Sequence, residues 1–300
     1  MSNQTLQIDF SRDLKNLLLN QLKSGGYHFN RKLELSKIVQ QYFNITLREI
    51  KATPRTINIS NRLKKNMPFG NVRRAFDNII KLAESGRNMN HYQSKELINP
   101  DYKDRLLYDW GIYHLHLGLC NDHKDPRFIA RTKDLLFVIV NDADFYCIDI
   151  LDHDPIDSFA NQELIETAHH NWPSLLSRHK INAIKVSPNK FLNANINTLR
   201  KSGVSYIFTV ADGTMYISAG GGYATDGSSI SVQMHTDKLL KSIRDLKNTV
   251  IKNEKELRSQ INHKTGINID HIKLKLMSWD NNTVTVLEEN TKLNLNIPWV

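Results

Sequence analysis

The sequence predicts an α+β protein in which an N-terminal helical domain precedes a mostly antiparallel sheet with packed helices. Three observations predict this class. Apolar residues recur at helical spacing in the first third of the chain, short apolar segments separated by turn residues fill the centre, and hairpin patterns flank one long polar helical segment near the end. We expect domains at residues 1–100, 101–180 and 181–300.

The N-terminal third is predicted to be mainly helical. Residues 10–23 and 33–43 carry apolar side chains at helical spacing, and a glycine pair ends the first of these segments. Residues 56–60 are consistent with a short strand, and residues 72–83 form a third amphipathic helix. A basic cluster precedes and enters that helix. The cluster consists of Arg62, Lys64, Lys65, Arg73 and Arg74. It is consistent with nucleic-acid binding, although an ordinary helical domain is the simpler interpretation.

The centre is predicted to contain three strands and one helix. Residues 111–119, 135–140 and 145–151 fit strands, and the turn-rich residues 141–144 join the last two. Residues 161–170 then fit a helix. Trp172 lies at its end before a proline, and we expect this side chain in the core.

The C-terminal part is predicted to alternate hairpins with one helix. Residues 204–210 and 214–218 form a hairpin across an Ala-Asp-Gly turn, and residues 229–234 fit a strand. Residues 237–257 fit a long polar helix. Residues 273–279 and 283–288 form the last hairpin.

Charge is distributed unevenly along the chain, whose net charge is +9. Residues 1–100 hold 17 Lys and Arg against 7 Asp and Glu, residues 101–180 hold 8 against 14, and residues 181–300 hold 15 against 10. Basic flanks suit a polyanion such as RNA or DNA, although a solvated basic surface gives the same pattern.

Other features of the sequence favour a cytoplasmic protein that does not enter the membrane. The sequence has no secretory signal pattern, and no apolar run approaches the ~20 residues that a membrane span needs. Cys120 and Cys147 lie outside any CxxC pattern, so we expect two reduced thiols rather than a disulfide or a thiolate zinc site.

Histidines are concentrated in the acidic centre, where seven of the 12 lie between residues 114 and 179. On a strand, His114 and His116 project from one face, because side chains alternate with period two. His153 follows the third strand and joins them if that strand ends beside the first. Such a group suits acid/base chemistry at a phosphate, metal ligation, or purely structural hydrogen bonds.

Two further groups define the candidate site. Arg131 precedes the second strand, where its guanidinium suits a phosphate contact or a surface ion pair. Asp152 adds a carboxylate beside the histidines. We therefore predict two alternative sites. The first is a catalytic set without a cofactor, formed by His114, His116, Arg131 and His153. The second binds a divalent metal ion through His114, His116, Asp152 and His153.

The order of elements in residues 111–153 resembles the core of RelE-like bacterial toxins, which are small ribonucleases with a curved antiparallel sheet. The resemblance implies that Arg131 contacts phosphate and that His114, His116 and His153 are acid/base groups. Those toxins are shorter and basic in this segment. The flanking regions of this chain are therefore expected to supply the affinity for RNA.

Three functions follow as hypotheses. The first is an endoribonuclease of toxin or phage-defence type, with RNA as its ligand and an antitoxin protein as a possible partner. The second is a metal-dependent hydrolase or nuclease, which the clustered carboxylates favour. The third is a nucleic-acid-binding protein without enzymatic activity, in which the histidines are structural.

Overall fold

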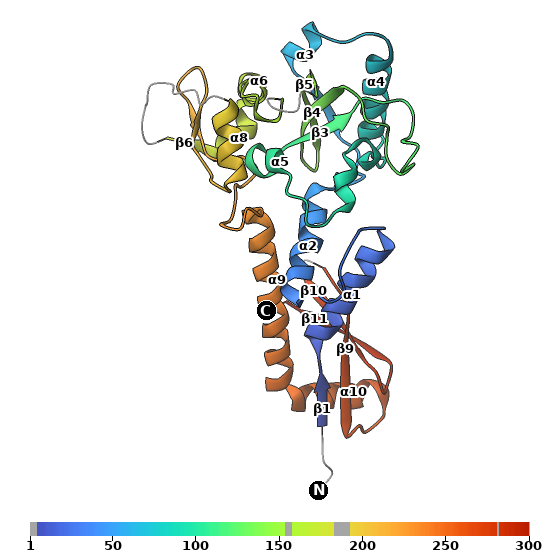
Figure 1. The fold of residues 1–300 in the computed structure, drawn as a ribbon. Helices are drawn as coiled ribbons and strands as arrows, with labels where there is room; N and C mark the ends of the chain where they lie inside the picture. Colours follow the sequence, from blue (N-terminus) through green and yellow to red (C-terminus); the bar gives the residue numbers. More distant parts are fainter. Residues whose placement is uncertain (1–4, 154–157, 183–192, 281, 300) are drawn as a thin grey trace. The chain divides into compact units, whose positions relative to one another are not determined.

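The computed structural model describes residues 5–153, 158–182, 193–280 and 282–299. It confirms the α+β class, since helices are interleaved with three sheets (Figure 1). The chain divides into two compact units, of which unit 1 comprises residues 1–43 and 234–300 and unit 2 comprises residues 44–233. Residues 1–100 are thus shared between the units. A distinct N-terminal helical domain is not formed.

Unit 1 is built on a four-stranded sheet in the order β1-β9-β10-β11. β1 (Thr5–Ile8) pairs in parallel with β9 (His271–Trp279), and β10 (Thr283–Glu288) pairs antiparallel with β9 and with β11 (Leu293–Pro298). The predicted C-terminal hairpin is therefore confirmed.

The helix α1 (Phe10–Ser24) packs against β9, as its leucine spacing requires. It buries Leu14, Leu18 and Leu22, and its Asp13 carboxylate accepts a 2.9 Å hydrogen bond from the Leu276 amide. Burial raises the pKa of Asp13. Sheet and helix together form the core of unit 1.

The predicted strand at residues 229–234 is wrong, because these residues begin the long helix α9 (Ile230–Lys252). Over these few residues the apolar Ile230, Val232 and Met234 alternate with polar residues, as in a strand. Over a longer stretch the buried positions Val232, Leu239, Ile243, Leu246 and Val250 keep helical spacing, and that period decides the structure. The helix α10 (Glu254–Thr265) follows and ends at Gly266.

Unit 2 contains a second four-stranded sheet in the order β2-β5-β4-β3. β2 (Thr56–Ile59) is parallel to β5 (Asp144–Asp152), whereas β4 (Asp134–Val140) is antiparallel to β5 and to β3 (Ile112–His116). These bounds confirm all four strands that the sequence predicted for this region.

Helices cover both faces of this sheet. One face packs against α3 (Asn61–Lys65) and α4 (Gly70–Glu84) through residues such as Leu115 and Val138. The other face packs against α6 (Glu163–Asn171), α7 (Pro173–Leu176) and α8 (Asn193–Lys201) through Ile112 and Phe137. Trp172 packs against this second core, as predicted.

Short elements complete unit 2. The helix α5 (Arg105–Trp110) leads into β3 through Gly111, whose φ of 70° suits glycine. A small sheet in the order β6-β8-β7 joins Lys180–Ile181, Met215–Tyr216 and Phe208–Thr209, which confirms the predicted central hairpin in shortened form. The remaining elements are α2 (Leu35–Arg48), η1 (Asn90–Tyr92), η2 (Lys95–Ile98), η3 (Ser158–Ala160) and η4 (Ser177–His179). Among the residues described, no helix is both long and apolar enough to span a bilayer.

Candidate functional site

The structure brings the three predicted histidines together, with His114 and His153 against Phe159 and His116 against His153. His114 and His116 lie on β3, and His153 follows the end of β5. The ring centroids of His114 and His153 lie 4.9 and 5.6 Å from that of Phe159, and the rings of His116 and His153 are stacked with centroids 6.4 Å apart. His114 and His116 therefore lie on one face of β3, as the alternation of side chains along a strand predicts.

Two of these imidazoles are held neutral near pH 7. Burial lowers the pKa of His116 to about 4, and the charges of His114, Arg131 and His153 act in the same direction. Burial also lowers the pKa of His114, although Asp104 opposes the shift. The Nδ1 atoms of both rings are shielded from solvent and lack a hydrogen-bond partner among the described residues. The neutral imidazole is the form that accepts a proton, and the lowered pKa makes each ring a weaker base than a free imidazole.

Arg131 is exposed, and it acts on both rings through its charge. The part of the chain that the structure describes gives it no ion pair. A surface pair with a carboxylate stays an alternative prediction, since Asp154 and Asp157 lie outside the described residues.

The predicted metal site is not assembled. Asp152 forms an ion pair with Lys133, whose Nζ lies 2.6 Å from its Oδ2. Within the described ranges, which omit residues 154–157, no group of three or more His, Cys, Asp or Glu is arranged to hold a metal ion. The structure therefore does not support ligation by His114, His116, Asp152 and His153.

His114 and Phe159 also line a cavity of about 400 Å³. Its other walls come from the segment that enters α5 and from one side of α8. Four of the lining side chains are basic and one is acidic, so the cavity has the size and charge of a site for a small anionic ligand. The complete lining is Tyr102, Lys103, Asp104, Arg105, Leu106, His114, Phe159, Asn197, Thr198, Arg200 and Lys201.

Arg200 anchors the cavity to the core through a buried ion pair. Its Nε donates to Asp109 Oδ2 at 2.8 Å, and the two side chains are 2% and 0% exposed. The hydroxyls of Tyr206 and Ser218 donate to the same carboxylate, each at 2.9 Å. The guanidinium lies 4.2 Å from the ring centroid of Trp110, a cation–π contact. The carboxylate of Asp109 is thus fully satisfied.

The guanidinium of Arg200 is only partly satisfied. Nη1 donates to the Phe159 carbonyl, whereas Nη2 is buried and has no partner among the described residues. Burial alone lowers the pKa of Arg200, but the Asp109 carboxylate outweighs it and raises the pKa overall. Arg200 is therefore a permanent charge with one donor that no described residue uses, and leaving such a donor unpaired costs about 1–3 kcal/mol. A ligand anion in the cavity offers the missing acceptor.

The wall opposite α8 is fixed by polar contacts from α2. Asn44 Nδ2 donates to the Pro100 and Tyr102 carbonyls at 2.8 and 2.9 Å, and Arg48 Nη2 donates to the Asn99 carbonyl at 2.7 Å. The Tyr108 hydroxyl donates to Asn44 Oδ1. These bonds hold the segment that carries Lys103 and Arg105 against the unit 2 core.

A glycine fixes the loop behind Asp109. The Gly220 amide donates to the Asp109 carbonyl at 2.8 Å. A Cβ built on Gly220 would lie 2.0 Å from the Leu107 carbonyl oxygen, so only glycine allows this approach. The loop also places Ser218 on the Asp109 carboxylate, which completes the network beneath Arg200.

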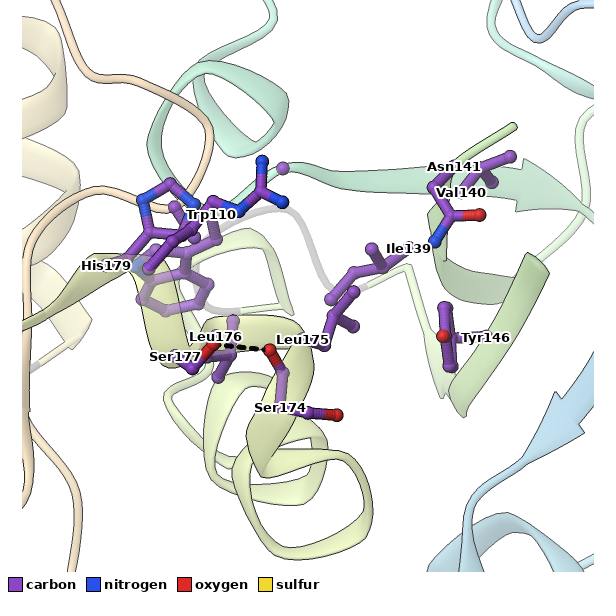
Figure 2. A pocket seen from close by; sticks show the side chains of 13 residues that line it. Trp110, Ile139, Val140, Asn141, Tyr146, Ser174, Leu175, Leu176, Ser177 and His179 are labelled. Carbon is purple, nitrogen blue, oxygen red and sulfur yellow. Dashed lines mark hydrogen bonds between the residues drawn. The ribbon is translucent and has the colours of Figure 1, made fainter. Parts of the chain in front are cut away.

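A second cavity of about 540 Å³ is lined by Trp110 and by residues of β4, β5 and α7 (Figure 2). Figure 2 shows Asn141 and Tyr146 at one end and Trp110 and His179 at the other, with Leu175 between them. Burial and the charge of Arg178 lower the pKa of His179. None of the predicted catalytic residues lines this cavity. It also has fewer basic groups, so the cavity beside His114 is the better candidate.

Sequence reasoning missed the residues that make the cavity basic. Arg200 meets Asp109 across 91 positions of the chain, and no local pattern announces such a pair. Lys103, Arg105 and Lys201 likewise converge only in the fold. The one available signal was an aspartate within the apolar residues 106–110, because a buried carboxylate requires a partner.

Comparison with protein-family models, curated proteins and solved structures gives no match for this chain. The function is therefore inferred from the geometry of the site.

Proposed function

We propose that unit 2 is a metal-independent endoribonuclease, of toxin or phage-defence type, that holds an RNA phosphate in the basic cavity beside His114. The observation that carries the proposal is the meeting of His114, which burial keeps neutral, with Arg200 and three further basic side chains in one cavity. Such an enzyme acts on cytoplasmic RNA, and a toxin of this kind is held inactive by an antitoxin protein.

The proposed reaction is an internal transfer of the phosphoryl group. His114 accepts the proton of the ribose 2′-hydroxyl, whose oxygen attacks the neighbouring phosphorus. The bond from phosphorus to the 5′-oxygen breaks, and that oxygen takes a proton from His153. The products are a 2′,3′-cyclic phosphate and a 5′-hydroxyl end. Arg200 and Lys201 offset the negative charge that develops on the phosphate oxygens.

Arg131 and His116 have supporting roles in this proposal. Arg131 adds positive charge outside the cavity and so favours approach of the RNA backbone. His116 is buried and stacked on His153, and it orients that ring without touching the substrate. His116 is therefore a positioning residue.

Incubation of the purified full-length protein with RNA, with and without a chelator, tests the proposal. Cleavage that resists the chelator and leaves 2′,3′-cyclic phosphate ends is expected. His114→Ala is expected to lower the rate by about 10²-fold or more. His123→Ala, at an exposed histidine outside the cavity, is the matched control and should cleave normally. Loss of cleavage on chelation, or an unchanged rate in folded His114→Ala, would overturn it.

A nucleic-acid-binding protein without catalysis is the second candidate. The observation that favours it is the burial of His116, which is 3% exposed and unable to reach a substrate directly. RNA that binds with strong salt dependence but stays intact over long incubation would establish this candidate.

A further inference from the structure

A basic surface lies where α3 is joined to α4 in unit 2 (Figure 1). Residues 61–76 contain five Lys and Arg and no Asp or Glu. Arg62 is engaged, since its Nε and Nη2 lie 2.6 and 2.7 Å from carboxylate oxygens of Asp149 and Glu163. Four basic side chains remain exposed on this surface, namely Lys64, Lys65, Arg73 and Arg74.

An aromatic ring stands in the middle of these charges. Phe69 is 92% exposed, the highest value among the exposed large hydrophobic side chains of the described residues. The next residue, Gly70, has a φ of 63°, and a Cβ built on it would meet nothing within 4 Å. Both residues of this junction therefore face open solvent. Exposing a Phe side chain forgoes about 1.5–3 kcal/mol of burial, so the fold itself gains nothing from it.

The charges at the start of α4 oppose the intrinsic stability of the helix. Phe69 is the N-cap residue and provides no side-chain hydrogen bond, and the first turn contains no acidic residue. Arg73 and Arg74 instead bring positive charge to the positive end of the helix dipole. Asp77 compensates Arg73 at 2.8 Å, but no ion pair is found for Arg74 within the described residues. An anion bound here would accept hydrogen bonds from the uncapped N-terminus of α4 and would offset the positive charge of Arg74.

We propose that Phe69, Lys64, Lys65 and Arg74 form a docking surface for single-stranded nucleic acid. One base stacks on the Phe69 ring, and the adjacent phosphates are neutralised by the basic side chains and the open N-terminus of α4. Stacking platforms combine an exposed aromatic ring with exposed basic groups, and Phe69 with Lys64, Lys65 and Arg74 has this composition. This proposal rests on the proposed function in one respect, which is that the strand held on this surface is the RNA substrate.

A membrane surface is the less suitable partner. Insertion into lipid requires a band of apolar side chains beside the charges. Phe69 stands alone here, because the preceding Met67 and Pro68 are half-buried. A single ring provides contact for one base but little anchorage in a bilayer.

The test measures binding of the full-length protein to a fluorescent oligothymidylate of about 20 nucleotides by anisotropy. This probe has no 2′-hydroxyl, so the proposed cleavage does not act on it. Phe69→Ala and Phe69→Leu are expected to weaken binding about tenfold, because both lose the π-face, whereas Phe69→Tyr keeps it and should bind like the wild type. The equal effect of Ala and Leu is the signature of stacking.

Controls separate this surface from general effects. Ile251→Ala removes an apolar side chain that is 50% exposed in unit 1, and it should leave the affinity unchanged. Unchanged circular dichroism confirms that each variant is folded. The proposal would be overturned if Phe69→Ala bound oligothymidylate with wild-type affinity. It would also be overturned if Phe69→Leu kept the wild-type affinity and the protein bound vesicles of anionic lipid.

The outcome is independent of catalysis. If the protein binds oligothymidylate through Phe69 but does not cleave RNA, the surface stands and the proposed function fails. If it cleaves RNA with cyclic ends while Phe69→Ala binds as well as the wild type, the surface fails and the proposed function stands.

Discussion

Unit 2 carries two sets of positive charge, one around a buried guanidinium in the cavity and one on an exposed surface. In the cavity, Arg200 is buried, paired with Asp109 and stacked on Trp110. At the junction of α3 and α4, Lys64, Lys65 and Arg74 are exposed and have no ion pair among the described residues. The Arg200 guanidinium is therefore part of the core, whereas Lys64, Lys65 and Arg74 only border it.

Buried charges and exposed charges contribute to different properties of the protein, the first to folding stability and the second to association. Removing one member of a buried pair strands the other in a medium of low dielectric, which is costly. Exposed charges are screened by water and salt, so they contribute little to stability but attract an oppositely charged partner. Substitutions of the buried pair Arg200 and Asp109 should therefore destabilise the protein, and substitutions on the exposed surface should change binding alone.

The largest expected effect is that of Asp109→Ala. It leaves the Arg200 guanidinium without its carboxylate and the Tyr206 and Ser218 hydroxyls without their acceptor. The free energy of unfolding should fall by about 3–5 kcal/mol, measured by urea denaturation. Asp77→Ala, which breaks the exposed pair with Arg73, is the matched control and should cost less than about 0.5 kcal/mol. Equal losses in the two variants would remove the distinction between buried and exposed charge.

The second effect is a dependence of stability on pH that originates in the buried histidine. The pKa of His116 is lowered to about 4 in the folded protein, against about 6.5 in the unfolded chain. The unfolded chain therefore binds more protons between these values, and stability is full above pH 6.5 and declines as the pH falls toward 4. The shift corresponds to about 3 kcal/mol over that window.

Replacing the ring isolates this contribution from that of other groups. His116→Leu removes a ring whose Nδ1 has no partner in the described structure but which makes one hydrogen bond to the Thr132 backbone, so it should cost only about 0.5–1.5 kcal/mol at neutral pH. The difference in unfolding free energy between pH 7 and pH 5 should be smaller in this variant than in the wild type. An identical pH dependence in both proteins would show that His116 is not buried as described.

The sequence predicted local features well and convergent ones poorly. The leucine spacing of residues 10–23 and the alternation around His114 follow from backbone geometry alone, so α1 and the shared face of β3 were predicted. Residues 230–234 alternate locally, and only the longer period of α9 shows them to be helical. The pairing of Arg200 with Asp109 depends on how α8 meets α5, which no spacing in the chain records.

The third effect concerns the salt dependence of binding. Each phosphate that a lysine neutralises adds about 0.7 to the slope of log affinity against log salt for a single strand. Lys64→Gln should therefore reduce that slope by about 0.7 for oligothymidylate, with stability unchanged. Lys238→Gln, on α9 in unit 1, is the control and should keep the wild-type slope. An unchanged slope in Lys64→Gln would remove this lysine from the docking surface.

The smallest expected effect is the change in the free energy of unfolding on replacing Phe69. A small change would show that the ring has no structural role. A ring that is 92% exposed makes almost no contact that folding depends on, so Phe69→Ala should alter the free energy of unfolding by less than about 0.5 kcal/mol. The same substitution is expected to weaken binding about tenfold. A large loss of stability would mean that the ring packs against the protein. The exposed charges would then surround a structural residue rather than a stacking platform, and the contrast between the two sets of charge would rest on the cavity alone.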